Sequence, residues 1–355
     1  MRKIYLFTFM MLLLVHLKGQ AQQITLHVER AGTLHGMINA SRLPYITDLK
    51  LTGELNGTDI SFIRTLVKKN LRFLDLSEAR IVEGGAIYYS NYRTSNDIIG
   101  SYMFYNPDYS PISPCAISKI NLPNSVTGIE EGAFKSCTRL TDINIPNSVT
   151  SIEWATFYSC TSLTDINIPN SVTSIGGGAF SGCTSLTDIN IPNSVTSIER
   201  STFYSCTGLT SINIPGSVTT IGSNAFYSCT SLTDINIPNS VTSIGEQAFY
   251  NCDNLKSVYM NASTPPFIGS QAFHNISKDL TIYIPRGSYT AYWLSYWGNY
   301  NLVEYDPTDI QGVTTSAHNG VEKYFSIDGR PLPGPCKGVN IIQDTDGKTR
   351  KAWIP

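Results

Sequence analysis

The chain has 355 residues, of which 41% are hydrophobic and 15% are charged, and its formal net charge is −2. Proteins that bind nucleic acids usually cluster Lys and Arg against the phosphate backbone, so this charge balance argues against such a partner. Disordered chains are rich in charge and poor in large apolar side chains. The composition therefore predicts a folded protein whose surface is polar but carries little charge.

The N-terminus has the three parts of a secretory signal peptide. Two basic residues precede the apolar residues 4–15, and Gly19 and Ala21 supply the small side chains of a cleavage site. The apolar run is shorter than the roughly 20 residues that a membrane-spanning helix needs. We expect residues 1–21 to be removed on export. The mature protein would then lie at the cell surface, associated with the outer membrane or outside the cell, without a transmembrane segment.

Residues 22–114 form the next predicted region. Apolar residues around Leu49 and Leu74 have the spacing of short buried strands, and Asp59 between them is placed to cap an amphipathic helix. Residues 106–114 have the composition of an inserted loop. We expect this region to be a divergent N-terminal part of the repeat structure that follows.

The following segment, residues 115–305, is dominated by a 23-residue repeat. Its period is marked by Cys137, Cys160, Cys183, Cys206, Cys229 and Cys252. Within one unit the apolar positions are Leu163, Ile166, Ile168, Pro169, Val172, Ile175, Ala179, Phe180 and Cys183. Internal repeats of this length are typical of solenoids, because a single coil cannot bury its apolar side chains without neighbours.

The spacing L-x-x-I-x-I within each unit is that of the strand in a leucine-rich repeat. The twofold alternation of a strand turns Ile166 and Ile168 inward and Asp165 and Asn167 outward. The fold class that we predict is a repeat solenoid, a leucine-rich repeat right-handed coil. It has about ten coils of mostly 23 residues, with short parallel strands from Leu49 to Ile284.

The C-terminal end of the solenoid needs a cover, because an open end exposes apolar core. An aromatic stretch lies where this cover is expected, and a sugar-binding cluster is the alternative for it: Tyr289, Tyr292, Trp293, Tyr296, Trp297 and Tyr300. Residues 306–320 are predicted to be a linker. Residues 321–355 hold two extended runs and an Asp346-Gly347 hairpin turn, which predicts a small C-terminal β segment for sorting or anchoring.

Residues 117–252 closely resemble the BspA-like leucine-rich repeats of bacterial surface proteins, whose unit is similar to LTDINIPNSVTSIGGGAF here. The resemblance implies an exported, non-enzymatic protein, and some members of this family are adhesins for host matrix proteins or other cells. The C-terminal sequence YFSIDGRPLPGPCKGVNII resembles the type IX sorting segments of exported bacterial proteins. Partners vary within the family, so the resemblance names none.

No catalytic or metal-binding motif supports an enzyme. The five histidines are scattered outside the repeats, and no nucleophile elbow or H-E-x-x-H sequence is present. We therefore expect no catalytic residues and no cofactor. Zinc is not expected because the repeats contain no C-x-x-C pair. The cysteine column either forms disulfides, as an oxidising compartment would allow, or consists of free thiols in the core, which parallel side chains favour.

Two polar columns are expected on the outer face of the strands. They comprise Asp142, Asp165, Asp188 and Asp234, and, two residues later, Asn144, Asn167, Asn190 and Asn236. Stacked carboxylates about 5 Å apart repel one another, so a bound cation or a basic partner would reduce the repulsion between them. A solvated acidic strip without a ligand is the alternative.

A second candidate surface lies beside the phenylalanine of each repeat. It comprises Trp154, Tyr158, Tyr204, Tyr227 and Tyr250. Aromatic side chains provide a large contact area with a polar edge, which suits protein or glycan ligands. The alternative is that these rings only cover the edge of the core.

The sequence leaves two functional hypotheses. One is a non-enzymatic surface protein that mediates protein–protein interaction or adhesion through the solenoid. The other is a carbohydrate-binding or structural cell-envelope protein that uses the solenoid as a spacer. A protein ligand, such as a host matrix or another cell-surface protein, is the expected partner, with a glycan as the alternative.

Overall fold

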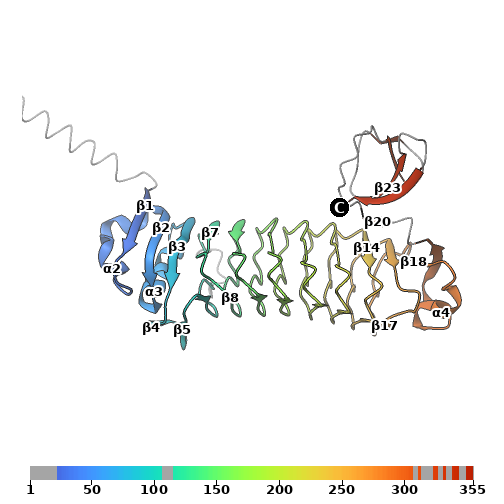
Figure 1. Cartoon of the computed structure of the whole chain (residues 1–355), viewed down its shortest axis with the longest axis horizontal. Coiled ribbons are helices and arrows are strands. Elements are labelled where there is room, and N and C mark those ends of the chain that lie inside the picture. Colours follow the sequence, from blue (N-terminus) through green and yellow to red (C-terminus); the bar gives the residue numbers. More distant parts are fainter. Residues whose placement is uncertain are drawn as a thin grey trace, which may run out of the picture.

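The computed structural model describes residues 22–105 and 115–306, and beyond them the backbone of five short strands between residues 311 and 354. Residues 22–105 and 115–306 form one elongated stack of coils, with α3 near one end and α4 at the other (Figure 1). The predicted repeat solenoid is therefore confirmed. The predicted signal peptide and the expected loop at residues 106–114 lie outside the described residues.

One side of the stack carries two parallel sheets, which run in the orders β1-β2-β3-β7-β9 and β14-β16-β18-β19. Their strands are β1 (Gln22–Val28), β2 (Ile46–Leu55), β3 (Phe73–Ile81), β7 (Lys119–Asn121), β9 (Asp142–Asn144), β14 (Asp234–Ile237), β16 (Ser257–Met260), β18 (Thr281–Pro285) and β19 (Asn301–Tyr305). Equivalent residues of successive coils face each other, as in Ile120 beside Ile143. The 23-residue period therefore fixes the register.

A second side carries short strands at the Ser-Ile or Thr-Ile of each repeat, in the orders β6-β8-β10-β11 and β12-β13-β15-β17. These strands are β6 (Ile98–Ile99), β8 (Gly128–Ile129), β10 (Ser151–Ile152), β11 (Ser174–Ile175), β12 (Ser197–Ile198), β13 (Thr220–Ile221), β15 (Ser243–Ile244) and β17 (Phe267–Ile268). The strand spacing of the leucine-rich repeat did not predict this side. It shows that each coil is hydrogen-bonded to its neighbours at more than one place.

The third side is held by backbone bonds around the repeated phenylalanine. The N–H of Phe157 donates to the carbonyl of Ala179 at 2.8 Å, and the N–H of Phe180 donates to Thr202 at 2.9 Å. Two residues per coil adopt positive φ here, for example Ala155 (52°) and Ser159 (58°). These left-handed residues turn the chain sharply, so each coil closes within 23 residues.

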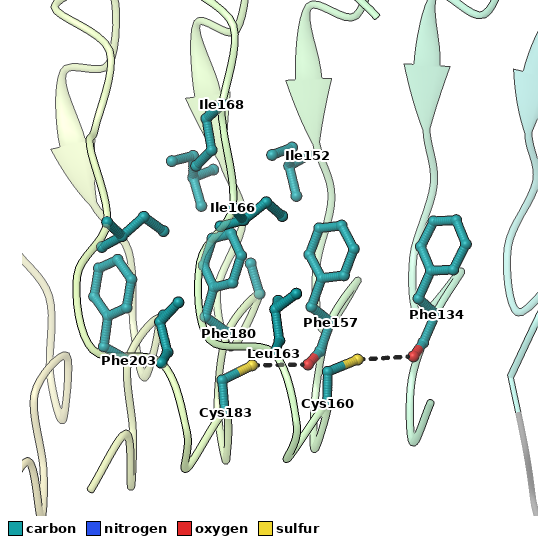
Figure 2. Packing of buried hydrophobic residues seen from close by; sticks show 14 of the residues in the cluster. Phe134, Ile152, Phe157, Cys160, Leu163, Ile166, Ile168, Phe180, Cys183 and Phe203 are labelled. Carbon is teal, nitrogen blue, oxygen red and sulfur yellow. Dashed lines mark hydrogen bonds between the residues drawn. The ribbon is translucent and has the colours of Figure 1, made fainter. Parts of the chain in front are cut away.

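The core is one continuous cluster along the solenoid, and a column of stacked phenylalanines lies within it. The centroids of Phe157 and Phe180 are 5.4 Å apart, with ring planes 11° from parallel. Figure 2 shows this column beside the buried isoleucines Ile152, Ile166 and Ile168. The stack begins at Phe104 and reaches Phe273 without interruption. The inward positions predicted from the repeat are thus confirmed.

Three of the ten expected strands do not form a ladder. The central coils that contain Ile168, Ile191 and Ile214 bury these side chains, but the described backbone there holds only the isolated bridge between Asn190 and Asn213. Threonines connect these coils instead. The N–H and Oγ1 of Thr210 both donate to the carbonyl of Thr187, each at 3.1 Å. The first side is therefore continuous in packing but not in strand pairing.

The N-terminal end contains α2 (Leu34–Met37), the 3-10 helix η2 (Ala40–Tyr45), the helix α3 (Gly57–Val67), and the antiparallel pair β4 (Gly84–Tyr89) and β5 (Tyr92–Thr94). Our prediction that Asp59 caps α3 was wrong by three residues, because Asn56 is the N-cap. Asp59 completes a capping box and is buried, and its carboxylate accepts bonds from the N–H groups of Asn56 and Leu34 at 3.0 Å. It therefore ties α3 to the preceding segment.

The aromatic stretch at the other end divides into a buried and an exposed set. Helix α4 (Tyr289–Trp293) and the 3-10 helix η3 (Tyr296–Asn299) bury Tyr292 and Trp297 over the last coil. The hydroxyl of Tyr292 donates to the carbonyl of Ala262, and the indole N–H of Trp297 donates to Pro266, each at 2.8 Å. These two residues are the expected cap.

The strands near the C-terminus form a five-stranded sheet of their own, in the order β20-β24-β23-β21-β22. They are β20 (Gln311–Gly312), β21 (Lys323–Ser326), β22 (Pro331–Leu332), β23 (Gly338–Gln343) and β24 (Thr349–Ile354). Strands β23 and β24 pair in antiparallel fashion on either side of Asp346-Gly347. The segment is therefore a β sheet, and its assignment to sorting or anchoring stays a prediction.

Candidate functional site

The acidic column of the strand face is partly neutralised by its own neighbours. Lys119 occupies the same position one coil earlier, and its Nζ lies 2.6 Å from Oδ2 of Asp142. Asp165 and Asn167 are exposed, as predicted. The side-chain oxygen of Asn144 accepts a bond from the N–H of Leu122 at 2.7 Å. The side chains of the column thus lie in different local environments.

Asp234, like Asp188, is partly buried, whereas Asp142 and Asp165 are exposed. Burial raises the pKa of the Asp234 carboxyl, and a hydrogen bond from the Thr233 hydroxyl at 2.8 Å to Oδ2 opposes this change. Its Oδ1 atom is buried without a partner. Asn236, two residues later, is also partly buried. The acidic column therefore does not present four equivalent carboxylates to a ligand.

The strand face does not assemble a metal site in the part of the chain that the structure describes. No three His, Cys, Asp or Glu side chains lie together there in an arrangement that could hold an ion. The carboxylates point outward one per coil, and Ser211 interrupts their column. The strand face can offer single charged contacts in series, which suits an extended basic surface more than a cation.

The edge column, in contrast, is built from one structural position that repeats in every coil. It is the residue that directly follows each stacked phenylalanine: Tyr105, Lys135, Tyr158, Ser181, Tyr204, Tyr227, Tyr250 and His274. The phenylalanines are buried, and their successors are only partly buried or exposed, except for the buried Ser181. The rigid phenylalanine stack therefore sets the spacing of a row of surface side chains.

At the N-terminal half of this row, aromatic rings surround a cation. The Nζ atom of Lys135 lies 5.0 Å from the ring centroid of Tyr158, 5.8 Å from that of Tyr105 and 6.0 Å from that of Trp154. These are distances at which an ammonium is attracted to ring faces. We call Tyr105, Lys135, Trp154 and Tyr158 the Trp154 cluster.

Trp154 is the most exposed aromatic residue of this cluster, with 53% of its surface accessible. Its indole lies against the next coil, where Gly177 occupies the equivalent position. A methyl group added to Gly177 would come within 3.3 Å of Cδ1 of Trp154. The glycine therefore makes room for the indole, which remains on the surface instead of covering the core.

In the C-terminal half of the row the aromatic rings stack on each other. Tyr204 and Tyr227 have centroids 4.7 Å apart, Tyr227 and Tyr250 5.0 Å, and His274 continues the row at 5.6 Å from Tyr250. We call these four residues the tyrosine ladder. Because the ring faces cover one another, the ladder presents ring edges and hydroxyl groups to solvent.

The two groups of rings are separated by a single coil with small side chains. In that coil Ser181 takes the place of the tyrosine and is buried, and Gly178 and Gly182 adopt positive φ. Tyr158 therefore has no stacking partner in the next coil. The predicted edge residues consequently belong to two different sites, with Trp154 and Tyr158 in one and Tyr204, Tyr227 and Tyr250 in the other.

The cysteine column lies inside the core. The seven described cysteines are buried free thiols. Each repeat thiol donates to the carbonyl of the phenylalanine one coil earlier, as Cys160 does to Phe134 and Cys183 to Phe157, both at 3.2 Å (Figure 2). Burial raises the pKa of the Cys183 thiol to about 12. The hypothesis of free core thiols is therefore the one that the structure supports.

The C-terminal cap carries an exposed aromatic surface next to its buried residues. Tyr289 and Trp293 have ring planes 10° from parallel and centroids 6.0 Å apart, and with Leu294 and Tyr296 they are exposed. Residues 287–303 contain no charged side chain. A groove of about 500 Å³ beside the cap is lined by uncharged residues only, namely Asn239, Val241, Thr242 and residues 261–266.

Sequence reasoning missed four members of the edge column. Tyr105, Lys135, Ser181 and His274 follow a stacked phenylalanine just as the predicted tyrosines do. The signal was the position after the phenylalanine, but a search for tyrosines within the regular repeats passes over a lysine, a serine and a histidine, and over Tyr105, which precedes those repeats. Lys135 changes the chemistry of the site most, because it places a positive charge among aromatic rings.

The comparison with known families decides which repeat this is. The family model described as "BspA type Leucine rich repeat region" matches residues 97–231 and 196–304, with 6 copies. The chain belongs to the BspA-type leucine-rich repeat family. The resemblance seen in the sequence is thereby confirmed for the solenoid.

Solved structures of similar proteins come from several bacteria. A leucine-rich repeat protein from Bacteroides ovatus is 22% identical over 68% of this BspA-type chain and 75% of its own, with a TM-score of 0.36. The T. pallidum leucine-rich repeat protein is 26% identical over 59% and 77%, with a TM-score of 0.37. A leucine rich cell surface protein from Faecalibacterium prausnitzii is 20% identical over 77% and 90%, with a TM-score of 0.28.

No curated protein matches this BspA-type chain. In the described part of the chain no helix is long and apolar enough to span a membrane. The family is known from the repeats. A binding partner has to be inferred from the chemistry of the surface.

Proposed function

We propose that this BspA-type protein is an exported, non-enzymatic cell-surface protein that binds another protein through the Trp154 cluster. The observation that carries the proposal is the exposed Trp154 indole beside Lys135 and Tyr158. Tryptophan and tyrosine with a nearby cation are the residue types that dominate the energy of protein interfaces. Only one such cluster occurs along the described edge column, so it offers a partner a single register.

The signal-like residues 1–21 and the family membership support export to the cell surface. The strand face is a weaker candidate. At least one of its aspartates is already paired with a lysine of the same chain, and Asp188 and Asp234 are partly buried. Fewer accessible carboxylates therefore remain for a partner than the column has aspartates.

The test measures the affinity of the mature chain for a panel of purified matrix proteins by surface plasmon resonance. Trp154→Ala should weaken binding to the partner found in this way by at least tenfold, which is about 1.4 kcal/mol. Tyr204→Ala, on the same edge but in the tyrosine ladder, is the matched control and should change affinity much less. High salt should have a small effect, because buried aromatic area dominates the contact.

A second set of variants tests the alternative that the partner binds to the strand face. Replacing Asp142, Asp165, Asp188 and Asp234 by Asn removes the acidic column. If this set and high salt weaken binding while Trp154→Ala does not, the strand face is the binding surface and the proposal is wrong. If neither set changes affinity, neither the Trp154 cluster nor the acidic column is the binding surface, and the proposal is wrong.

The second candidate function is binding of a neutral glycan at the C-terminal cap. The favouring observation is the uncharged exposed surface of Tyr289, Trp293 and Tyr296. Exposed ring faces and uncharged hydrogen-bonding groups suit a neutral sugar better than a charged partner. A glycan array with the parent chain and Trp293→Ala tests this function, and Trp154→Ala is its control. Binding that survives Trp293→Ala would exclude the cap.

A further inference from the structure

Cys115 stands apart from the thiols of the repeats. It lies 22 residues before Cys137, one fewer than the period, and it directly follows residues 106–114. The Cys115 sulfur contacts not a phenylalanine carbonyl but Sγ of Cys137, with the two sulfur atoms 3.6 Å apart. The Cys137 thiol in turn lies 3.3 Å from the carbonyl oxygen of Phe104. The irregular spacing thus brings one pair of sulfurs into contact.

The electrostatic surroundings of this pair also differ from those of the other cysteines. Hydrogen bonding with Cys137 lowers the pKa of Cys115, against the effect of burial, and the guanidinium charges of Arg64 and Arg139 act in the same direction as the hydrogen bond. Burial raises the pKa of Cys160 and Cys183. Cys115 is therefore the cysteine of this column with the greatest thiolate character, and thiolates are the form that oxidants attack.

Arg64 is held at this place by the backbone. Its Nη1 donates to the carbonyls of Tyr102 and Met103 at 2.8 and 2.7 Å, and Nη2 reaches that of Tyr105 at 3.3 Å. Arg64 and Cys115 both line a small cavity of about 10 Å³. A cavity of this size holds at most about one water-sized molecule.

We propose that Cys115 and Cys137 form a reversible disulfide when a peroxide oxidises Cys115, while the thiols of the other described coils stay reduced. A disulfide bond is about 2.05 Å long, so the two sulfurs have to approach by about 1.5 Å. The bridge fastens the chain directly after residues 106–114 to the coil that contains Cys137. That coil also contributes Lys135 to the Trp154 cluster.

The chemistry proceeds in two steps. The Cys115 thiolate attacks one oxygen of the peroxide; the S–O bond forms, the O–O bond breaks, and the leaving hydroxide takes a proton to become water. The sulfur of Cys137 then attacks the sulfur of the Cys115 sulfenic acid; the S–S bond forms, the S–O bond breaks, and a second water leaves with the Cys137 proton. Two electrons pass from the thiols to the peroxide. An external dithiol reverses the reaction.

The test starts from the reduced, folded mature chain treated with hydrogen peroxide. The expected product has lost the mass of two hydrogen atoms, yields a cross-linked peptide that contains Cys115 and Cys137 on non-reducing digestion, and unfolds at a higher temperature. Dithiothreitol should reverse all three changes. Cys115→Ser should abolish the cross-link, and Cys183→Ser, which removes a thiol bonded to a carbonyl, should leave it intact.

A second experiment covers the case in which the peroxide does not reach the buried sulfur atoms. The reduced chain is unfolded in denaturant and refolded in a mixture of oxidised and reduced glutathione, and its cysteines are mapped again. The proposal is wrong if Cys115 and Cys137 are both free after peroxide treatment and after this refolding. It is also wrong if another pair of the repeat cysteines is cross-linked in preference.

Discussion

The phenyl rings of Phe180 and Phe203 lie parallel to within 5°, with centroids 5.7 Å apart, although 23 residues separate them in the chain. Each ring fills the same place in its own coil, and each is fully buried. The surface side chain that follows each phenylalanine takes its spacing from this stack. The core phenylalanines and the row of side chains on the candidate binding edge therefore belong to one repeated dipeptide, beside which Trp154 lies.

Phe180→Ala should lower the free energy of unfolding by about 3 to 5 kcal/mol, because it leaves a cavity between two rings that cannot close. Denaturant unfolding measures the loss. Tyr204→Ala on the surface of the neighbouring coil is the control and should cost less than about 1 kcal/mol. A loss below about 1 kcal/mol for Phe180→Ala would contradict its inward position.

The cysteine column predicts that stability falls at alkaline pH. Burial raises the pKa of Cys183 to about 12 in the folded state, whereas an unfolded cysteine ionises near pH 8.5. The unfolded state therefore loses this proton first, and the native state becomes relatively less stable as the pH rises from about 8.5 towards about 12. Below about pH 8.5 both states keep the proton, and the thiol adds no pH dependence.

The check is to measure the free energy of unfolding between pH 9 and pH 11 for the parent chain and for Cys183→Ala. In this range the slope of the variant should be shallower by up to about 1.4 kcal/mol per pH unit. Identical slopes would show that Cys183 ionises as easily in the folded chain as in the unfolded one. Ser181→Ala in the same coil is the control, because it removes no titrating group.

Asp234→Asn should stabilise the protein at neutral pH. Burial raises the pKa of this carboxyl, so its ionised form is disfavoured in the native state and stability declines as the pH rises through the folded pKa. Removing the charge should gain up to about 1 kcal/mol at pH 7. The gain should shrink in acid, where both states are protonated. The exposed Asp165→Asn is the matched control, and a stability loss for Asp234→Asn would contradict this account.

Deletion of residues 164–186 removes one period and should leave a folded solenoid, because the flanking coils have the same register. The deleted coil is the one with Ser181, so the deletion places Tyr158 one coil from Tyr204. Circular dichroism and cooperative unfolding report on the fold. Deletion of only twelve of these residues is the control and should prevent folding, because it places core residues on the surface. Loss of folding with the 23-residue deletion would contradict a simple stack.

The sequence by itself determined the solenoid, because a strict 23-residue period leaves one way to superimpose the coils. The inward faces of Ile166, Phe180 and Cys183 follow from that period together with the alternation of a strand. The family could also be predicted, since the repeat unit is the feature by which the family is defined. Each of these properties depends on residues that are close in the sequence.

Only the tertiary structure showed which surface side chains of neighbouring coils contact each other. Lys135 meets Tyr158 and Trp154 only because stacking brings adjacent coils into contact. The same stacking of coils places the ring of Tyr204 face to face with that of Tyr227, and it leaves Trp154 exposed beside Gly177. A one-dimensional period shows which residues form a column, but contact between side chains depends on their size and direction. For that reason the candidate site could be located from the sequence but not divided into its two parts.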